Sequence, residues 1–209
     1  MKYSNRSRRG FIASMASVMG GLFVYRTASA KGLTPQTTEG PFYPTHSMRF
    51  ADIDNDLVKV EGTVKQAGGE VFYLKGVITD KQGKPQPGLR IEIWQTDMNG
   101  RYLHSADNRA VAYDHGFQGF GHDITDANGA YRFRTIKPNR YPGRTPHIHV
   151  KVLNSERELL TTQFYIKDHP SNAQDGLFGW MSDTEQEAVS MAFKSGANGV
   201  EATVNVTIA

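Results

Sequence analysis

The sequence predicts an all-β protein, an antiparallel β-sandwich with one short helix. Polar and apolar residues alternate in residues 57–64 (LVKVEGTV), 70–80 (EVFYLKGVITD) and 147–153 (HIHVKVL), and 89–97 (LRIEIWQTD) is a further run of this kind. A period of two is the pattern of a strand that turns one face to a core. Turn signals separate these runs, and a single stretch has a helical pattern. Short strands joined by tight turns are typical of a two-sheet sandwich.

A small repeat marks three of the turns. The pattern Thr-Asp-x-x-Gly begins at Thr79, at Thr96 and at Thr125, each time between alternating runs. In such a turn the Asp side chain bonds to backbone N–H groups that follow it, and Gly supplies a positive φ. We therefore expect these aspartates to be structural.

The remaining elements follow along the chain. Residues 158–166 (ELLTTQFYI) are expected to form a strand, and 199–208 alternate as a closing strand. The helical segment is expected to run from Thr184 to Lys194. Its cap would be Asp183 or Thr184, with Glu187 following in the first turn. The lead-in after Lys31 and the stretch 102–123 read as irregular loops.

The first thirty residues have the features of an export signal. They include the twin-arginine pattern SRRGFI at 7–12, a weakly apolar stretch at 11–25 and an A-x-A cleavage site at 28–30. The apolar stretch is too short for a stable membrane span. We expect a twin-arginine signal peptide at 1–30, one domain at 31–209, and a periplasmic or secreted protein exported in folded form.

Charge and cysteine content exclude several classes. The whole chain has 24 basic and 21 acidic residues, but five of the basic ones lie in residues 1–30, which leave 19 against 21 and a net charge of −2. This balance gives no support for nucleic-acid binding or for an anionic membrane partner. The chain has no Cys. Disulfides and thiolate ligands are therefore excluded, and a metal would be bound by His, Tyr or carboxylates.

One group of residues has the composition of a metal centre. His147 and His149, at i and i+2 of an alternating run, point to the same face of a strand. Tyr141 and Arg144 precede them in a Pro-rich loop, and Tyr102 follows the second turn of the repeat. Phenolate is a hard donor that favours ferric iron. A His-x-His pair alone would fit ordinary strand packing equally well; the accompanying residues favour a metal.

The sequence resembles the intradiol ring-cleavage dioxygenases, the family of protocatechuate and catechol dioxygenases. The matching motifs are W-Q-x-D-x-x-G-x-Y (94–102), Y-x-F-x-T-I-x-P-x-x-Y-P (131–142), R-x-x-H-I-H (144–149) and T-x-G-P (38–41). Together they extend from Thr38 to Gln163. The resemblance implies a sandwich of the transthyretin (prealbumin) type.

The resemblance also implies a cofactor and a reaction. The cofactor is Fe(III), and its ligands are Tyr102, Tyr141, His147 and His149. A small aromatic diol is opened by O2 between its hydroxyl carbons to a cis,cis-muconate. Tyr141 is implied as the ligand that leaves and acts as a base, although the sequence does not decide which tyrosine is axial.

Further residues are implied to surround the substrate. Arg144 is implied to place its charge over the substrate ring. The residues implied to line the substrate pocket are Gln163, Thr38, Gly40 and Pro41. The loop from Tyr141 to His147 is shorter than in protocatechuate dioxygenases, so the identity of the catechol stays open, and a homo-oligomer is compatible with the sequence.

Two alternatives belong to other classes of protein. The T-D-x-x-G-x-Y-x-F pattern at 125–133 also resembles transthyretin-like accessory modules of exported proteins, which do not catalyse. A copper or zinc enzyme could use His147 and His149 alone. The visible spectrum separates the three, because tyrosinate–Fe(III) charge transfer colours a protein red and the other two lack it.

Overall fold

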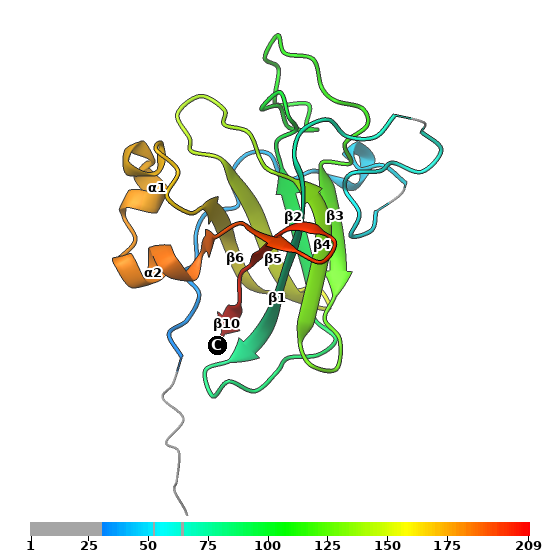
Figure 1. The fold of residues 1–209 in the computed structure, drawn as a ribbon. Coiled ribbons are helices and arrows are strands. Elements are labelled where there is room, and N and C mark those ends of the chain that lie inside the picture. The colour runs from blue at the N-terminus through cyan, green and yellow to red at the C-terminus, as the bar shows by residue number, and fades with distance from the viewer. Residues whose placement is uncertain (1–30, 52, 64) are drawn as a thin grey trace, which may run out of the picture.

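Two five-stranded sheets pack face to face in the computed structural model, which describes residues 31–51, 53–63 and 65–209 (Figure 1). The first sheet has the order β10-β1-β9-β8, and its fifth strand, β4, also pairs with β1. The second sheet has the order β3-β2-β5-β6-β7. The strands of the first sheet are β1 (Val71–Asp80), β4 (Ala130–Ile136), β8 (Lys194–Gly196), β9 (Gly199–Thr203) and β10 (Val206–Ile208). Those of the second are β2 (Arg90–Gln95), β3 (Phe120–Ile124), β5 (His147–Asn154), β6 (Arg157–Ile166) and β7 (Ser190–Met191).

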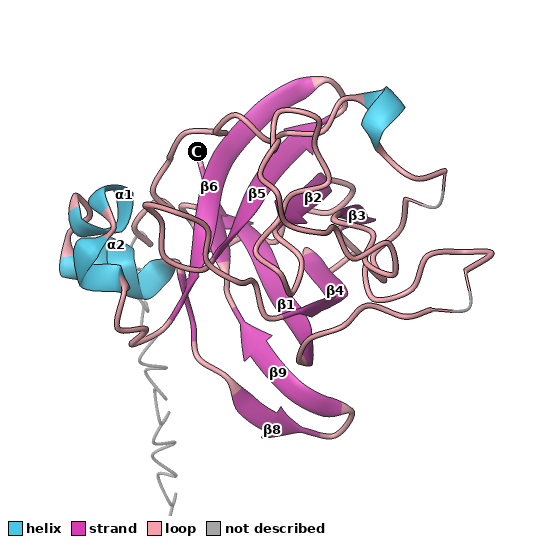
Figure 2. Ribbon diagram, turned by 90° about the horizontal axis from the view of Figure 1, so that it is seen from above, coloured by secondary structure: helices cyan, strands magenta, loops and turns pink. Residues whose placement is uncertain are grey.

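Short helices lie at the margins of the sandwich. The 3-10 helices are η1 (His46–Met48) and η2 (Asn172–Gln174), and the α-helices are α1 (Gly176–Gly179) and α2 (Asp183–Ala188). Seen from above, α1 and α2 lie together at one edge, beyond β6 (Figure 2). The predicted all-β sandwich is confirmed, with two short α-helices where one was expected.

Antiparallel pairing joins two pairs of strands of the second sheet that follow one another in sequence. These pairs are β2 with β3 and β5 with β6. The C-terminal strands β9 and β10 instead run parallel to β1, and β7 runs parallel to β6. Both sheets are therefore mixed. The last part of the chain adds strands that run parallel to β1 in one sheet and to β6 in the other.

The core lies between the sheets, and the alternation of β5 shows how it is built. Ile148, Val150 and Val152 are fully buried in it. The intervening His147 and His149 point to the other face of the second sheet, yet they are only 2% and 1% exposed. That face is covered by the segment 34–44, defined here as the N-terminal strap. The strap closes what would otherwise be an open polar face.

Hydrogen bonds attach the N-terminal strap along the second sheet. The backbone N–H of Thr37 donates to the carbonyl of Thr161 at 2.8 Å. Further along, the Glu39 carboxylate pairs with Lys151 of β5, and the Tyr43 hydroxyl donates to Glu92 of β2 at 2.6 Å. The strap therefore reaches across neighbouring strands of this sheet.

The predicted turns form as expected. In the turn after β1, Asp80 Oδ1 accepts from the backbone N–H groups of Gln82 and Lys84, and Gly83 has φ +79°. Asp97 and Asp126 accept from the backbone in the same way. These aspartates are used in shaping turns.

Several elements differ from the prediction. Residues 57–63 form turns and irregular backbone, because Leu57 and Val58 are both buried and a strand would have pointed one of them outward. The helix ends at Ala188, not Lys194, because Val189 enters the core and the next two residues pair with β6. Its N-cap is Ser182, in a capping box with Glu185. The closing strand is divided into β9 and β10.

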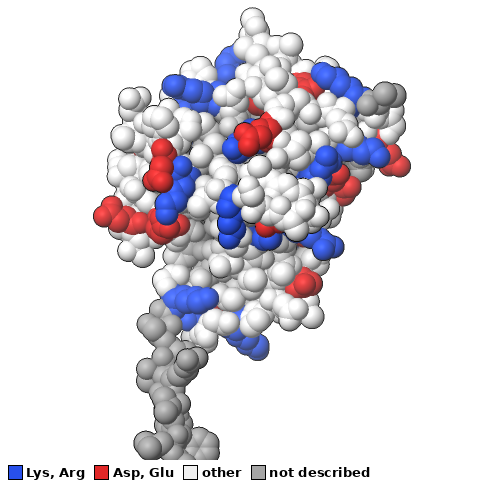
Figure 3. Space-filling model, viewed as in Figure 1, with Lys and Arg blue, Asp and Glu red and all other residues white. Residues whose placement is uncertain are grey.

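Two observations concern the surface and the ends of the chain. Among residues 31–51, 53–63 and 65–209, no helix has the length and apolar character that crossing a bilayer requires. On the face drawn in Figure 3, basic and acidic side chains are interspersed. The predicted twin-arginine segment at 1–30 lies outside the described residues.

Candidate metal centre

Four side chains predicted as ligands converge at the end of the sandwich where β5 begins. The Nε2 atoms of His147 and His149 are 3.2 Å apart, and the Tyr102 hydroxyl lies 3.4 Å from His147 Nε2. Tyr141 comes from the loop between β4 and β5. Its ring centroid is 5.5 Å from that of Tyr102 and 5.6 Å from that of His147. Residues up to 47 positions apart in sequence thus form one cluster of two imidazoles and two phenols.

Tyr102 is positioned by the turn that follows β2 and by one buried carboxylate, that of Asp107. Its backbone N–H donates to Asp107 Oδ2 at 2.8 Å, and the same carboxylate pairs with Arg109 at 2.6 Å. The Arg109 guanidinium lies 5.8 Å from the ring centroid of Tyr141. The loop 102–109 therefore connects both tyrosines through Asp107 and Arg109.

The tautomer of His147 is determined by the backbone. Its Nδ1 lies 2.7 Å from the carbonyl oxygen of Thr145, which can only accept, so Nδ1 carries the proton. Nε2 is then left with a lone pair directed at the cluster. Among the described residues the buried Nδ1 of His149 has no hydrogen-bond partner. Two adjacent imidazole nitrogens with a phenol beside them are a donor set that fits a bound cation.

In the metal-free protein, burial keeps the side chains of His147, His149 and Tyr102 neutral. Burial lowers the pKa of His147 to about 3, and the positive charge of Arg144 acts in the same direction. Burial and the neighbouring His147 hold the pKa of His149 well below its usual value. Burial, and then Tyr141, raise the pKa of Tyr102 well above 10. The imidazoles are thus ready to bind a metal, whereas the Tyr102 phenol would ionise only beside a strong Lewis acid.

Arg144 lies beside this cluster in a network of buried polar groups. Its Nε donates to Asp175 Oδ2 at 2.8 Å, and its Nη2 donates to Gln163 Oε1 at 2.6 Å. The Tyr165 hydroxyl also donates to Gln163 Oε1, at 2.9 Å. Gln163 is therefore held from two sides and is paired with His149 across β5 and β6.

The N-terminal strap brings the predicted T-x-G-P residues against the cluster. The Gln163 amide donates to the carbonyl of Thr38 at 3.1 Å. Gly40 has φ +73°, and a Cβ there would stand 3.2 Å from His149 Cε1. Pro41 follows, and Phe42 then stacks on Tyr102 with centroids 4.6 Å apart. Only a residue without a side chain allows the strap to approach the imidazole this closely.

The structure adds residues that the sequence analysis missed. Asp107, Asp175 and Tyr165 are buried and bonded to predicted site residues. Asp175 had a usable signal, since an Asp ahead of Gly-Leu-Phe can cap a helix. Phe42 had none beyond its place in the strap. His104, His115 and His122 are not among the four converging side chains.

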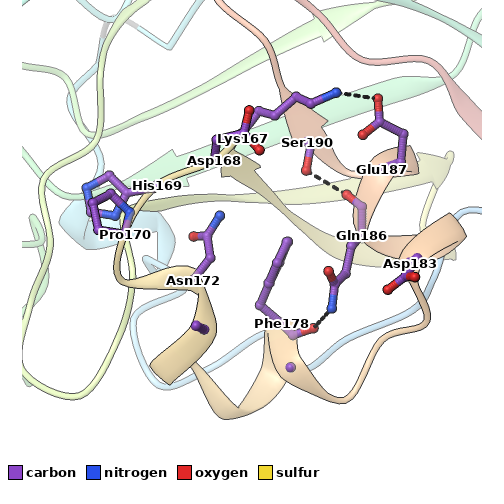
Figure 4. Close-up of a pocket in the computed structure, with 12 residues that line it drawn as sticks. Lys167, Asp168, His169, Pro170, Asn172, Phe178, Asp183, Gln186, Glu187 and Ser190 are labelled. Carbon is purple, nitrogen blue, oxygen red and sulfur yellow. Dashed lines mark hydrogen bonds and ion pairs between the residues drawn. The ribbon is translucent and has the colours of Figure 1, made fainter.

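One sizeable cavity among the described residues does not lie at this cluster. It has a volume of about 600 Å³ and lies between the loop after β6 and the two α-helices, with Asn172, Phe178 and Gln186 in its lining (Figure 4). The Lys167–Glu187 ion pair, 2.7 Å long, closes one side. A cavity of about 260 Å³ borders Tyr102, and one of about 80 Å³ borders Arg144. We assign the chemistry by the donor cluster, because cavity size alone does not identify reactive groups.

Comparison with known proteins shows the family to which the chain is similar. A family model described as "Dioxygenase" matches residues 38–206. The protocatechuate 3,4-dioxygenase beta chain of Burkholderia cepacia is 37% identical over 134 residues, which are 60% of this chain and 57% of that one. The catechol 1,2-dioxygenase of Acinetobacter baylyi is 30% identical over 196 residues, 80% of this chain and 58% of that one. The chain thus spans less than three fifths of the length of these two relatives.

Solved structures share the fold. The dioxygenase domain of a dioxygenase–carbohydrate-binding fusion from Streptomyces sp. SirexAA-E is 32% identical, with a TM-score of 0.62 over 84% of this chain and 97% of that one. An intradiol ring-cleavage dioxygenase from Tetranychus urticae, 24% identical, has a TM-score of 0.66 over 85% and 94% of the two chains and shows the fold alone. The accessory-module alternative is not favoured by these matches.

Proposed function

The chain belongs to the intradiol ring-cleavage dioxygenases, and we propose on this basis that it opens the ring of a catechol-type substrate with O2, using non-haem Fe(III). One observation carries the proposal. Two phenols and two imidazoles converge within a buried cluster, and a guanidinium lies beside it. Phenolate oxygens and imidazole nitrogens together are a donor set that fits a ferric centre.

Tyr102, Tyr141, His147 and His149 would bind the iron. Bound ferric iron would supply the Lewis acidity that ionises the phenols and the diol. His147 is held for this role by its bond to the Thr145 carbonyl. The buried Tyr102 would be the permanent phenolate ligand.

Tyr141 is the more accessible of the two phenols, since it is partly exposed while Tyr102 is 2% exposed. This difference supports Tyr141 as the ligand that leaves when the diol binds. As it leaves, its phenolate oxygen would accept a proton from a substrate hydroxyl and so act as a general base. Tyr102, which Phe42 covers, would remain in place.

Arg144 would stabilise negative charge that develops on the substrate ring. Its Nε and Nη2 are engaged by Asp175 and Gln163, and within the described residues no partner is recorded for Nη1. Nη1 is thus the nitrogen available to a bound molecule. A fixed cation that meets charge only in the transition state accelerates the chemical step.

The N-terminal strap and β6 would form the wall of the substrate pocket. The strap contributes Thr38, Gly40 and Pro41, and β6 contributes Gln163, whose amide joins strap and sheet. Together they keep water from one side of the cluster. The product would be a cis,cis-muconate. The relatives act, by name, on protocatechuate and catechol, and we leave the choice among catechols open.

We also propose that residues 1–30 direct export of the folded protein through a twin-arginine pathway to the periplasm or beyond. The SRRGFI pattern and the A-x-A site at 28–30 support this proposal. The N-terminal sequence of the exported protein tests it. We expect a mature chain that starts at Lys31. This mature chain should no longer be found when both arginines of the pattern are replaced by lysine.

Metal analysis and a visible spectrum of the purified protein test the proposed chemistry. We expect about one ferric iron per chain, a red colour, and muconate formation from catechol or a substituted catechol. Copper or zinc at full occupancy without iron would end the iron proposal. A colourless protein that stays inactive after reconstitution with iron would indicate a non-catalytic module.

A further inference from the structure

A single buried carboxylate, that of Asp175, connects Arg144 to the start of β5. Its Oδ2 accepts from Arg144 Nε at 2.8 Å and from the backbone N–H of Thr145 at 2.9 Å. Its Oδ1 accepts from the backbone N–H groups of Leu177 and Phe178, both at 3.1 Å, at the beginning of α1. The Asp175 side chain has no exposed surface, and that of Arg144 is 16% exposed. The carboxylate itself is therefore shielded from water.

The contacts fix the plane of the guanidinium and not only its position. Arg144 Nε and Nη2 both face Asp175, at 2.8 and 3.5 Å, and Nη2 also meets Gln163 at 2.6 Å. A planar guanidinium held along one edge cannot rotate without breaking these contacts. Its remaining nitrogen, Nη1, then points in a fixed direction.

The same carboxylate also acts on a predicted metal ligand. Thr145 donates its N–H to Asp175 and accepts from His147 Nδ1 at its carbonyl, at 2.7 Å. The Thr145 hydroxyl donates to Asn172 Oδ1 at 2.8 Å, which holds the residue from a third side. Asp175 thus reaches Arg144 directly and His147 through one residue.

The carboxylate is held in its charged form. Burial alone would raise the pKa of Asp175, but the hydrogen bond from Arg144 and those from the backbone of Thr145 and Phe178 outweigh it and lower the pKa. An ionised carboxylate in a buried site needs all its partners, so removing the charge would release Arg144.

We propose that Asp175 is a positioning residue of the dioxygenase reaction, which sets the orientation of the Arg144 guanidinium relative to the imidazole of His147. The inference rests on the proposed function, because it assumes that Arg144 acts on the substrate. It assigns to the segment at 172–177, outside the recognised motifs, an effect on the chemical step that acts through Arg144.

A double-mutant cycle tests the proposal by activity. Asp175→Asn keeps the shape of the side chain but removes its charge, and we expect kcat to fall on the order of ten- to a hundred-fold with KM nearly unchanged. In the Arg144→Ala background the same change should have little further effect, because the group being positioned is gone. Additive losses in the two backgrounds would contradict the proposal.

Asp114→Asn is the matched control. Asp114 is also a buried loop carboxylate with a basic partner, Lys65 at 2.8 Å, and with bonds from backbone N–H groups of Gly68 and Gly116. It lies outside the Arg144 network. Its replacement should lower stability but leave kcat unchanged, so a kcat loss equal to that of Asp175→Asn would contradict a specific role for Asp175.

A second variant covers the case in which Asp175→Asn does not fold. Asp175→Ser retains a side-chain acceptor for the N–H groups at the start of α1 but is too short to pair with Arg144. It should therefore preserve the helix cap and still lower kcat. Normal kcat in a folded Asp175→Ser variant would overturn the proposal.

A nuclear magnetic resonance measurement on metal-free protein needs no activity. The Nε–H signal of Arg144, identified by its absence in Arg144→Ala, should exchange slowly with water in the parent and in Asp114→Asn. Asp175→Asn and Asp175→Ser should accelerate this exchange at least ten-fold. Unchanged exchange would refute the positioning role. Accelerated exchange, together with a parent protein that neither binds iron nor opens catechol when iron is supplied, would instead refute the proposed function.

Discussion

The indole of Trp94 lies parallel to the imidazole of His149, with ring centroids 4.8 Å apart and planes inclined by 8°. The two residues are register partners on β2 and β5. Tyr43 of the N-terminal strap meets the indole edge-on, at 4.9 Å. The stacked indole therefore helps to hold the orientation of His149, whose Nδ1 has no hydrogen-bond partner among the described residues.

Replacement of Trp94 should therefore weaken metal binding. We expect Trp94→Leu to lower iron affinity about ten-fold, as loss of a group that orients a ligand does. It should also destabilise the fold by several kcal/mol, because Trp94 is fully buried. Competition with a chelator measures the first effect and urea unfolding the second. Trp180→Leu is the control, since Trp180 is 86% exposed, and equal losses in both variants would contradict the role of stacking.

The two tyrosines should respond differently to loss of their hydroxyls. Tyr102→Phe should weaken iron binding and shift the charge-transfer band, because the buried Tyr102 is proposed as the permanent ligand. Tyr141→Phe should retain iron better but slow the binding of catechol, followed by stopped-flow spectroscopy. Tyr113→Phe is the control, as the Tyr113 hydroxyl donates to the Phe117 carbonyl. Unchanged catechol binding in Tyr141→Phe would refute its role as a base.

Arg144→Ala should retain the iron and the colour change on addition of catechol, yet open the ring roughly 10²–10³-fold more slowly. The guanidinium is proposed to meet charge that develops in the chemical step, and such an effect appears in kcat more than in binding. Arg144→Lys should recover only part of the rate, because it lacks the planar fork. Arg134→Ala is the control: Arg134 pairs with Asp56, and its replacement should leave the rate unchanged. Near-normal turnover in Arg144→Ala would remove it from the mechanism.

Gly40→Ala should disturb the cluster through the strap. Both Gly40 and Gly83 have positive φ, +73° and +79°, so an Ala at either position strains the backbone by about 1–2 kcal/mol. Only at Gly40 does the added Cβ meet His149, at 3.2 Å; at Gly83 nothing lies within 4 Å. We expect similar losses of stability in the two variants but weaker iron binding only in Gly40→Ala. Equal iron binding would mean that the strap yields without moving His149.

The stability of the metal-free protein should fall as the pH drops from 7 to 5. Burial, aided by Arg144, lowers the pKa of His147 to about 3, so this side chain stays neutral in the folded state while the unfolded chain takes up a proton near pH 6.5. The unfolded state then binds more protons, which costs about 2 kcal/mol by pH 5 for this histidine. Urea unfolding at several pH values measures the slope. His147→Gln should make it shallower, and an unchanged slope would show that His147 is protonated in the fold.

Much of the candidate site follows from local patterns. The pleat of a strand places residues i and i+2 on one face, so His-x-His predicts two converging imidazoles wherever β5 lies. The Thr-Asp-x-x-Gly turn at Thr96 likewise determines the path of the backbone to Tyr102. These relations depend on a few neighbouring residues, and the resemblance to the family supplied the roles, which for Tyr102, Tyr141, His147 and His149 stay predictions.

Local patterns failed where long-range packing decided the backbone. Residues 57–64 alternate well enough to suggest a strand, but Leu57 and Val58 both enter the core. The expected helix to Lys194 stops at Ala188 because the following residues pair with β6, far from them in sequence. In the first segment, burial of apolar side chains decided the backbone against the local periodicity. In the second, pairing with β6 decided it.

The sequence by itself determined the class of fold, the turns and the donor types, because alternation, turn chemistry and ligand spacing act over a few residues. The tertiary structure alone decided which groups surround those donors. Asp175 reaches Arg144 across 31 positions, and Phe42 covers Tyr102 from the strap. Such pairings depend on which loops meet when the sheets close, and a buried charge or ring takes whatever partner that packing brings within contact distance.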